Sequence, residues 1–345
     1  MPTNVKENGF ESSIVSWLVQ HNGYEQGSNA DYNKEIAMDE TRLFRFLNTT
    51  QADKMKQLRL ENDPLEKEKF LQRLDQSLHT NGVIDLLRKG FRYKHLVLDV
   101  FYVRPSPGNE TAAKLYAQNI FSVTRQLQYS RQNPLLALDV CLFLNGLPIV
   151  TMELKNQLTK QNAADAVKQY KDERTPDEVL FSFKRCIVHF AVDDNEVRMC
   201  TELKGQKSWF LPFNKGYNDG AGNPPNPDGI KTDYLWKEIL RKDDLLHAAL
   251  PHHAAPLLNC SSVEASSPLH ADGGIVNALD NTLRAFFQQS LDVRPSAAAA
   301  VQHLGVRSKL QKMKPPPCHG TVPQVHHGDH DFPAKPHRLS GVLKK

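Results

Sequence analysis

Three charged residues interrupt an apolar stretch near the middle of the chain. Asp139 lies in the run LLALDVCLFL, and Glu153 and Lys155 lie in LPIVTMELK. Burying an unpaired charge is costly, so these side chains need one another or a cation. Two neighbouring carboxylates form a hard oxygen site suited to Mg²⁺, and a lysine beside them can orient a nucleophile or stabilise a transition state. These residue types therefore suit metal-assisted hydrolysis of a phosphodiester.

The register of the two apolar runs decides whether these residues can meet. Asn145-Gly146 lies between the runs and favours a tight hairpin turn. A strict two-residue turn would leave Asp139 and Glu153 on opposite faces of the sheet, and no site would form. Pro148 cannot donate to the strand ladder, so we predict an extra loop residue or a one-residue bulge there. That shift places Asp139 opposite Glu153, on the face that Lys155 shares.

A purely structural interpretation of the same residues stays open at this point. Acidic and basic residues two positions apart are common in strands, and the D-x13-ExK spacing alone is a weak motif. Asp139, Glu153 and Lys155 would then form an incidental ion-pair cluster at the end of a sheet.

Hydrophobic periodicity outlines the elements that must position the three residues. Apolar residues at helical spacing predict helices within 10–20, 39–60, 64–89 and 162–173, and β-branched and aromatic runs predict strands over 95–103, 186–192 and 197–203. Both arms of the 135–155 hairpin are apolar at successive positions, which is typical of central strands covered on both faces. We therefore predict an α/β fold, with a mixed central β-sheet flanked by helices, over residues 1–245.

Composition sets few limits on function. A net charge of +4 from 43 basic and 39 acidic residues does not by itself indicate nucleic-acid binding. The five cysteines form no CxxC pair and are predicted to be reduced and mostly buried thiols. No apolar run approaches the roughly 18 residues of a membrane helix, and the start lacks the pattern of a secretory signal, so we expect a cytoplasmic protein.

Residues 246–345 differ in character from the rest of the chain. They hold ten of the 14 histidines and ten of the 21 prolines, a composition that predicts a poorly ordered tail and also suits a frameshifted or truncated product. An isolated helix over 273–290 is the one regular element expected there. A zinc site is a weaker hypothesis, because the spacing of its ligands fits no established finger. Those ligands would be Cys318, His319, His326, His327 and His330.

The motif and its surroundings resemble a known family. LDVCLFLNGLPIVTMELKNQ is similar to the nuclease motif of the Type I restriction endonuclease R subunit, a member of the PD-(D/E)xK nuclease superfamily. FESSIVSWLVQHNGYEQG, NIFSVTRQLQYS and HFAVDDNEVRMCTELKG extend the likeness over roughly residues 8–245. The resemblance implies that Asp139 and Glu153 ligate Mg²⁺ and that Lys155 is the catalytic lysine. It also implies that Glu11 lies near the metal, although a solvated or capping glutamate is an equal alternative.

The resemblance also suggests residues that contact DNA. Many relatives carry Q-x-x-x-Y on the helix after ExK, and here Tyr170 fits the tyrosine, but Ala166 takes the place of the glutamine. Gln169 stands beside the tyrosine, so Gln169 and Tyr170 are candidates to face DNA or support the lysine. The alternative is that Tyr170 completes an apolar helix stripe.

A second set of candidate DNA contacts precedes the first strand of the hairpin. Arg125, Gln126 and Tyr129 lie in RQLQYS and could contact the phosphate backbone. The alternative is that they are ordinary solvent-exposed polar residues. The segment 209–228, rich in aromatic residues, Gly, Asn and Pro, is predicted to be a long loop that serves as a DNA or partner surface or only as a connection.

The family also implies partners. Its complete enzyme acts on double-stranded DNA with methylation (M) and specificity (S) subunits and an ATP-driven motor. The motor's phosphate loop needs a Gly-Lys dipeptide, which this sequence lacks, so no ATP binding through that motif is expected here. Without the motor, cutting is expected to be weak or undetectable. The rival hypothesis is a non-catalytic domain that binds DNA or partner subunits and has a degenerate metal site.

Overall fold

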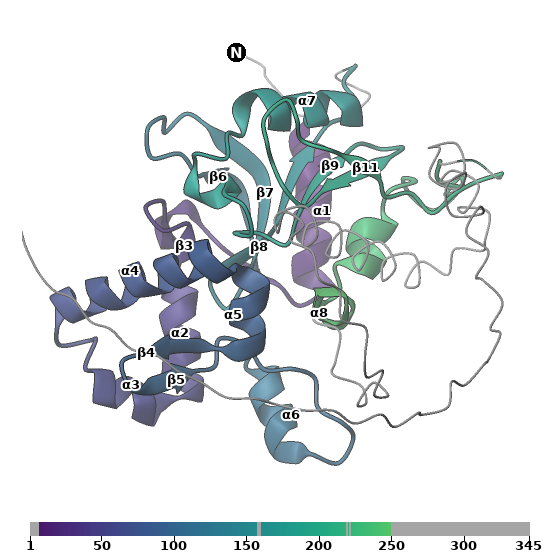
Figure 1. Ribbon diagram of the computed structural model, residues 1–345. Helices are drawn as coiled ribbons and strands as arrows, with labels where there is room; N and C mark the ends of the chain where they lie inside the picture. The colour runs from purple at the N-terminus through teal and green to yellow at the C-terminus, as the bar shows by residue number, and fades with distance from the viewer. Residues whose placement is uncertain (1–6, 157–159, 219, 221, 250–345) are drawn as a thin grey trace, which may run out of the picture. The chain divides into compact units, whose positions relative to one another are not determined.

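A seven-stranded mixed β-sheet organises the part of the chain that the computed structural model describes, residues 7–249 except 157–159, 219 and 221 (Figure 1). β1 pairs with β6 and β8 pairs with β9 in parallel, and the other neighbours are antiparallel. The predicted α/β fold with a mixed central sheet is therefore confirmed. The strands in spatial order are β1 (Glu25–Gln26), β6 (Phe121–Gln128), β7 (Ala137–Leu144), β8 (Leu147–Leu154), β9 (Val188–Val192), β10 (Val197–Cys200) and β11 (Leu211–Pro212).

Helices cover both faces of the central hairpin, as its apolar arms predicted. Ile14 and Leu18 of α1 (Glu7–Gln20) share a buried cluster with Leu142 of β7. Tyr170 of α7 (Ala163–Glu173) shares a second cluster with Phe143, the next residue of the same strand. Because successive strand residues point to opposite faces, α1 and α7 lie on opposite sides of the sheet.

The N-terminal half adds a group of helices beside the sheet (Figure 1). The predicted helical stretch 39–60 is interrupted at Gln51, and the stretch 64–89 divides at Gly82. The remaining α-helices are α2 (Glu40–Thr50), α3 (Ala52–Leu58), α4 (Pro64–Asn81), α5 (Val83–Lys89), α6 (Glu110–Ala117) and α8 (Lys242–Ala249). Short 3-10 helices form η1 (Asn29–Asp31) and η3 (Val179–Phe181), and a π-helix forms η4 (Leu235–Ile239). Two small hairpins pair β2 (Tyr32–Asn33) with β3 (Met38–Asp39) and β4 (Phe91–Tyr93) with β5 (Leu96–Leu98).

The predicted strand over 95–103 is wrong beyond Leu98. The backbone there pairs with a side chain instead of another strand, because the Gln51 amide donates to Asp99 O at 2.7 Å and accepts from Asp99 N at 2.9 Å. Val100 and Phe101 are buried, which explains the strand-like sequence. A buried segment that forms no backbone pairs with a strand has the same apolar sequence pattern as a strand.

Strand β6 was not predicted, although it is central to the sheet. Its residues Ser122 and Thr124 are buried polar side chains, which interrupt the apolar pattern that marks a covered strand. The strands within 186–192 and 197–203 and the helix capped by Asn162 are confirmed.

The hairpin of β7 and β8 contains the predicted bulge. Phe143 pairs with Pro148, but Leu142 pairs with Val150, so Ile149 is an extra residue on β8. The prediction of a one-residue shift at Pro148 is confirmed. Because the shift changes the register by one, it changes which face each later residue of β8 presents.

Several sequence expectations concern residues near or beyond the end of the described part. α8 continues to Ala249, past the expected domain end at 245, and that boundary stays a prediction. The 273–290 helix and the zinc hypothesis lie outside the described residues. Cys141, Cys186 and Cys200 are buried, as expected. No helix of the described ranges has the length and apolar character needed to cross a bilayer.

Replacing Asn145 by alanine should lower the free energy of unfolding by about 2–4 kcal/mol. Asn145 is fully buried with φ of 50°, its side chain accepts from Ile120 N at 2.6 Å and it donates to Val100 O at 2.9 Å. Alanine leaves both backbone groups buried without partners and tolerates this φ less well. Urea unfolding measures the effect. Asn81→Ala, at an exposed helix end, is the control, and equal effects of the two substitutions would contradict the account.

Candidate active site

Asp139 lies where β7 and β8 separate. The paired register ends at Val140 opposite Met152, and its continuation sets Asp139 against Glu153. The next backbone donor of β8, Leu154 N, bonds to Asp139 Oδ2 at 2.8 Å instead of to the β7 backbone. The carboxylate of Asp139 is therefore fixed beside β8, as the bulge predicted.

Glu153 is a fully buried carboxylate with one oxygen unpaired. Its Oε1 accepts from Arg174 Nε at 2.6 Å, whereas its Oε2 has no hydrogen-bond partner. Burial and the neighbouring charge of Asp139 together raise the pKa of Glu153 to about 8, against the lowering effect of Arg174. Leaving a buried oxygen without a partner costs free energy, so a cation or a proton at Glu153 Oε2 would stabilise the fold.

Arg174 holds Glu153 in place and was missed by sequence analysis. It directly follows α7, is buried, and donates to Tyr129 Oη and to Ala137 O, both at 2.9 Å. Its pKa is raised by the negative charge of Glu153, so it stays a cation. A basic residue at a helix C-terminus is a common stabilising feature, and nothing in its spacing marks it as part of a site.

A cavity of about 460 Å³ opens in front of these residues. Asp139, Lys155 and Gln169 line it together with Glu11, and Arg174 forms part of its wall. The backbone of Lys155 is fixed by a bond from its N–H to Val192 O at 2.8 Å, and its side chain is partly exposed. The structure thus brings the three motif residues to one place, with Glu153 buried behind the cavity wall.

The side-chain amide of Gln126 connects Glu11 to Asp139. Glu11 is buried on α1 and accepts from Arg125 Nε at 2.8 Å and from Gln126 Nε2 at 3.0 Å. Gln126 Nε2 also donates to Asp139 Oδ1 at 3.1 Å, so one amide group links Glu11 with Asp139. The alternative of a solvated or capping Glu11 does not fit its burial. Its role in metal binding stays a prediction.

The candidate DNA contacts fall into two groups. Arg125 is partly exposed, Gln126 is exposed, and Gln169 lines the cavity with a buried Oε1 that has no partner. Tyr129 and Tyr170 are buried, so a direct contact of either with DNA does not fit the structure. Tyr170 bonds to Thr151 Oγ1 at 2.8 Å and completes the apolar stripe of α7, which was the alternative for this residue.

A larger cavity, of about 1030 Å³, lies beside α2, α3 and α4. It lacks the hairpin carboxylates, and charged groups along it neutralise one another, as Lys67 Nζ and Glu40 Oε2 do at 3.3 Å. Asp139 and Lys155, two of the residues predicted from the sequence to do chemistry, line the smaller cavity instead.

The donor groups at the smaller cavity fit Mg²⁺ by type. In the part of the chain that the structure describes, no three His, Cys, Asp or Glu side chains form a cluster ready to hold a metal. The carboxylates of Glu11 and Asp139 line the cavity, and Glu153 Oε2 is a buried acceptor without a donor. Oxygen donors of this kind, completed by water, are what Mg²⁺ prefers in proteins.

Fold and site together define an α/β protein with a carboxylate and lysine site at the end of its central hairpin. The chain belongs to the family described as Type I restriction enzyme R protein N terminus, whose model matches residues 4–208. A comparison with curated protein sequences found no match. The family resemblance stated from the sequence is thereby confirmed.

The buried Glu153 should make stability depend on pH in the absence of metal. Its pKa is raised in the folded state to about 8 from 4.5, so its contribution is fully present below about pH 4.5 and is lost as pH rises through about 8. We expect wild type to lose up to about 1.4 kcal/mol per pH unit relative to Glu153→Gln over this window. Urea unfolding with a chelator at several pH values measures this difference, and parallel curves for the two proteins would contradict it.

Proposed function

We propose that this chain carries a Mg²⁺-dependent endonuclease domain of the PD-(D/E)xK type, which cuts double-stranded DNA within a Type I restriction complex. The observation that carries the proposal is the unpaired Oε2 of the buried Glu153, next to Asp139 and behind a cavity that Lys155 lines. A fold that only needed an apolar core would gain nothing from this arrangement.

Asp139 and Glu153 would hold the cation together with Glu11, which shares the Gln126 amide with Asp139. When bound, Mg²⁺ lowers the pKa of a water molecule and neutralises charge on the phosphate. Arg174 fixes one oxygen of Glu153 and leaves the other for the metal, since it donates only to Oε1. The bond to Oε1 would keep the carboxylate oriented, and Oε2 would remain available to the metal.

Lys155 supplies the positive charge at the edge of the cavity. Its backbone is fixed against β9, so its ammonium group works from a rigid strand end. There it can hold the scissile phosphate or stabilise the charge that develops on it. Gln169 Oε1, a buried acceptor without a partner on the same cavity, can accept a hydrogen bond from Lys155 or from the attacking water.

DNA would approach the exposed side of this cavity. Gln126 lines this cavity and Arg125 pairs with Glu11 of its wall, and both would contact phosphates, which positions a duplex without reading its sequence. Choice of target would then belong to the S and M subunits, and ATP to the motor of the full-length enzyme.

One observation favours a second candidate function, a non-catalytic domain that binds DNA or partner subunits. The ion pair of Arg174 with Glu153 already satisfies part of the charge that a metal would neutralise. In that case Arg174 would replace the cation permanently. The two candidates differ in whether the chain binds Mg²⁺.

Titrating Mg²⁺ calorimetrically into the full chain should give binding to wild type, and none to Asp139→Asn or Glu153→Gln. Lys155→Met should keep metal binding and lower, on the order of 100-fold, any plasmid nicking that wild type shows without the motor. Glu110→Gln and Lys168→Met change exposed residues away from the cavity and are the matched controls. Absence of Mg²⁺ binding to wild type, or equal binding to all variants, would support the non-catalytic domain instead.

A further inference from the structure

Gln126 adopts an uncommon backbone conformation inside a strand. Its φ is 45°, in the left-handed region that residues other than glycine rarely occupy. Its neighbours on β6 pair regularly with β7, Arg125 with Val140 and Leu127 with Leu138. Between them, Gln126 stands opposite Asp139 without a ladder pair. Such a conformation persists only where surrounding groups hold it.

Asn29 holds this part of β6. Its Nδ2 donates to Gln126 O at 3.1 Å, and its Oδ1 accepts from Gln128 N at 2.8 Å. The side-chain amide of Asn29 therefore makes the backbone bonds to β6 that a neighbouring strand would otherwise make. Asn29 begins η1, which lies 97 residues from Gln126 in the sequence.

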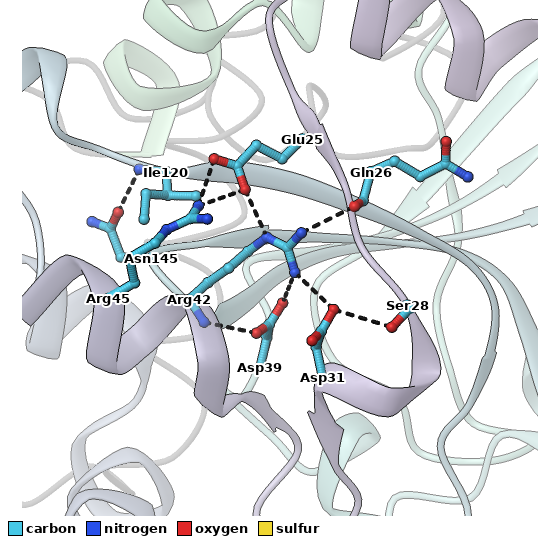
Figure 2. Close-up of polar contacts among 9 residues, drawn as sticks. All are labelled: Glu25, Gln26, Ser28, Asp31, Asp39, Arg42, Arg45, Ile120 and Asn145. Atoms are coloured by element: carbon cyan, nitrogen blue, oxygen red, sulfur yellow. Dashed lines mark hydrogen bonds and ion pairs between the residues drawn. The ribbon is translucent and has the colours of Figure 1, made fainter. Parts of the chain in front are cut away.

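An ion cluster around the buried Arg42 anchors η1 in turn. Figure 2 shows the guanidinium of Arg42 directed at Asp31, Asp39 and Glu25, with nitrogen–oxygen distances of 3.2, 2.7 and 3.1 Å. Arg42 also donates to Gln26 O at 3.0 Å. Contacts from a buried arginine thus fix the segment that presents Asn29, so the conformation of Gln126 is built into the fold.

This backbone conformation directs the Gln126 side chain between two acidic residues. Its Nε2 donates to Glu11 Oε2 at 3.0 Å and to Asp139 Oδ1 at 3.1 Å. An amide nitrogen has two hydrogens, so both bonds can form at once. A cation that bridged these two carboxylates would need the place that this nitrogen holds.

We propose that Gln126 is a positioning residue that holds the cation's place between Glu11 and Asp139 and leaves when the metal binds. The inference rests on the proposed function, because it requires a metal at this site. The amide relieves repulsion between the two carboxylates while the metal is absent. The metal must replace two hydrogen bonds to charged groups, so Gln126 lowers the metal affinity of the site. Because the side chain is exposed, it can swing into solvent without disturbing the core.

The test compares metal affinity in variants of the full chain. Mn²⁺ and Mg²⁺ are titrated calorimetrically into wild type, Gln126→Ala and Gln126→Met, of which the second keeps the length of the side chain without its donors. We expect both variants to bind on the order of 10-fold more tightly than wild type, the size of a lost charge-assisted hydrogen bond. Gln128→Ala changes an exposed glutamine on the same strand and should match wild type.

A second measurement separates displacement from a merely structural role. The side-chain NH₂ signals of Gln126 in the nitrogen-15 NMR spectrum, assigned by their loss in Gln126→Met, should move when Mg²⁺ is added to wild type. Unchanged or weaker binding in both folded Gln126 variants, while wild type binds, would overturn the inference and leave the proposed function intact. No binding by any protein in the series would overturn both.

Discussion

The structure depends on how a buried carboxylate is kept inside the central sheet. Glu153 has no exposed surface, and only one of its oxygens is paired, with Arg174 at 2.6 Å. Removing one partner of such a pair typically costs about 3–5 kcal/mol, because the other charge is left buried. The end of α7, the hydroxyl of Tyr129 and the carbonyl of Ala137 all serve to place that arginine. Loss of Arg174 would therefore leave the charge of Glu153 buried without a counter-ion.

The register of one hairpin decides whether this charge has a neighbour. The extra residue Ile149 shifts β8 by one position, and without the shift Asp139 and Glu153 would face opposite sides of the sheet. α1 covers one face and α7 the other, and Glu11 reaches the site from α1 through Gln126. A local irregularity on one strand thereby joins groups from separate helices and strands at one cavity.

The elements predicted correctly are those that depend on residues close together in the sequence. The hairpin, the helix capped by Asn162 and the bulge at Pro148 follow from neighbouring residues, and all three are confirmed. Groups joined over long sequence separations were missed. Arg174 lies 21 residues from Glu153, and Asn29 lies 97 residues from Gln126, and no periodicity relates either pair. The expected DNA contacts of Tyr129 and Tyr170 do not fit the structure, because both side chains are buried. An aromatic residue next to a site can either contact a ligand or pack in the core, and the sequence does not distinguish the two.

A crystal structure of the chain soaked in Mn²⁺, with the metal located by its anomalous scattering, tests the central claim most directly. We predict a peak about 2.0–2.4 Å from an oxygen of Asp139 and from Oε2 of Glu153, the range for hard cations on carboxylates, while Arg174 keeps its bond to Oε1. A peak elsewhere only, or none at concentrations that occupy other Mn²⁺ sites, would contradict it.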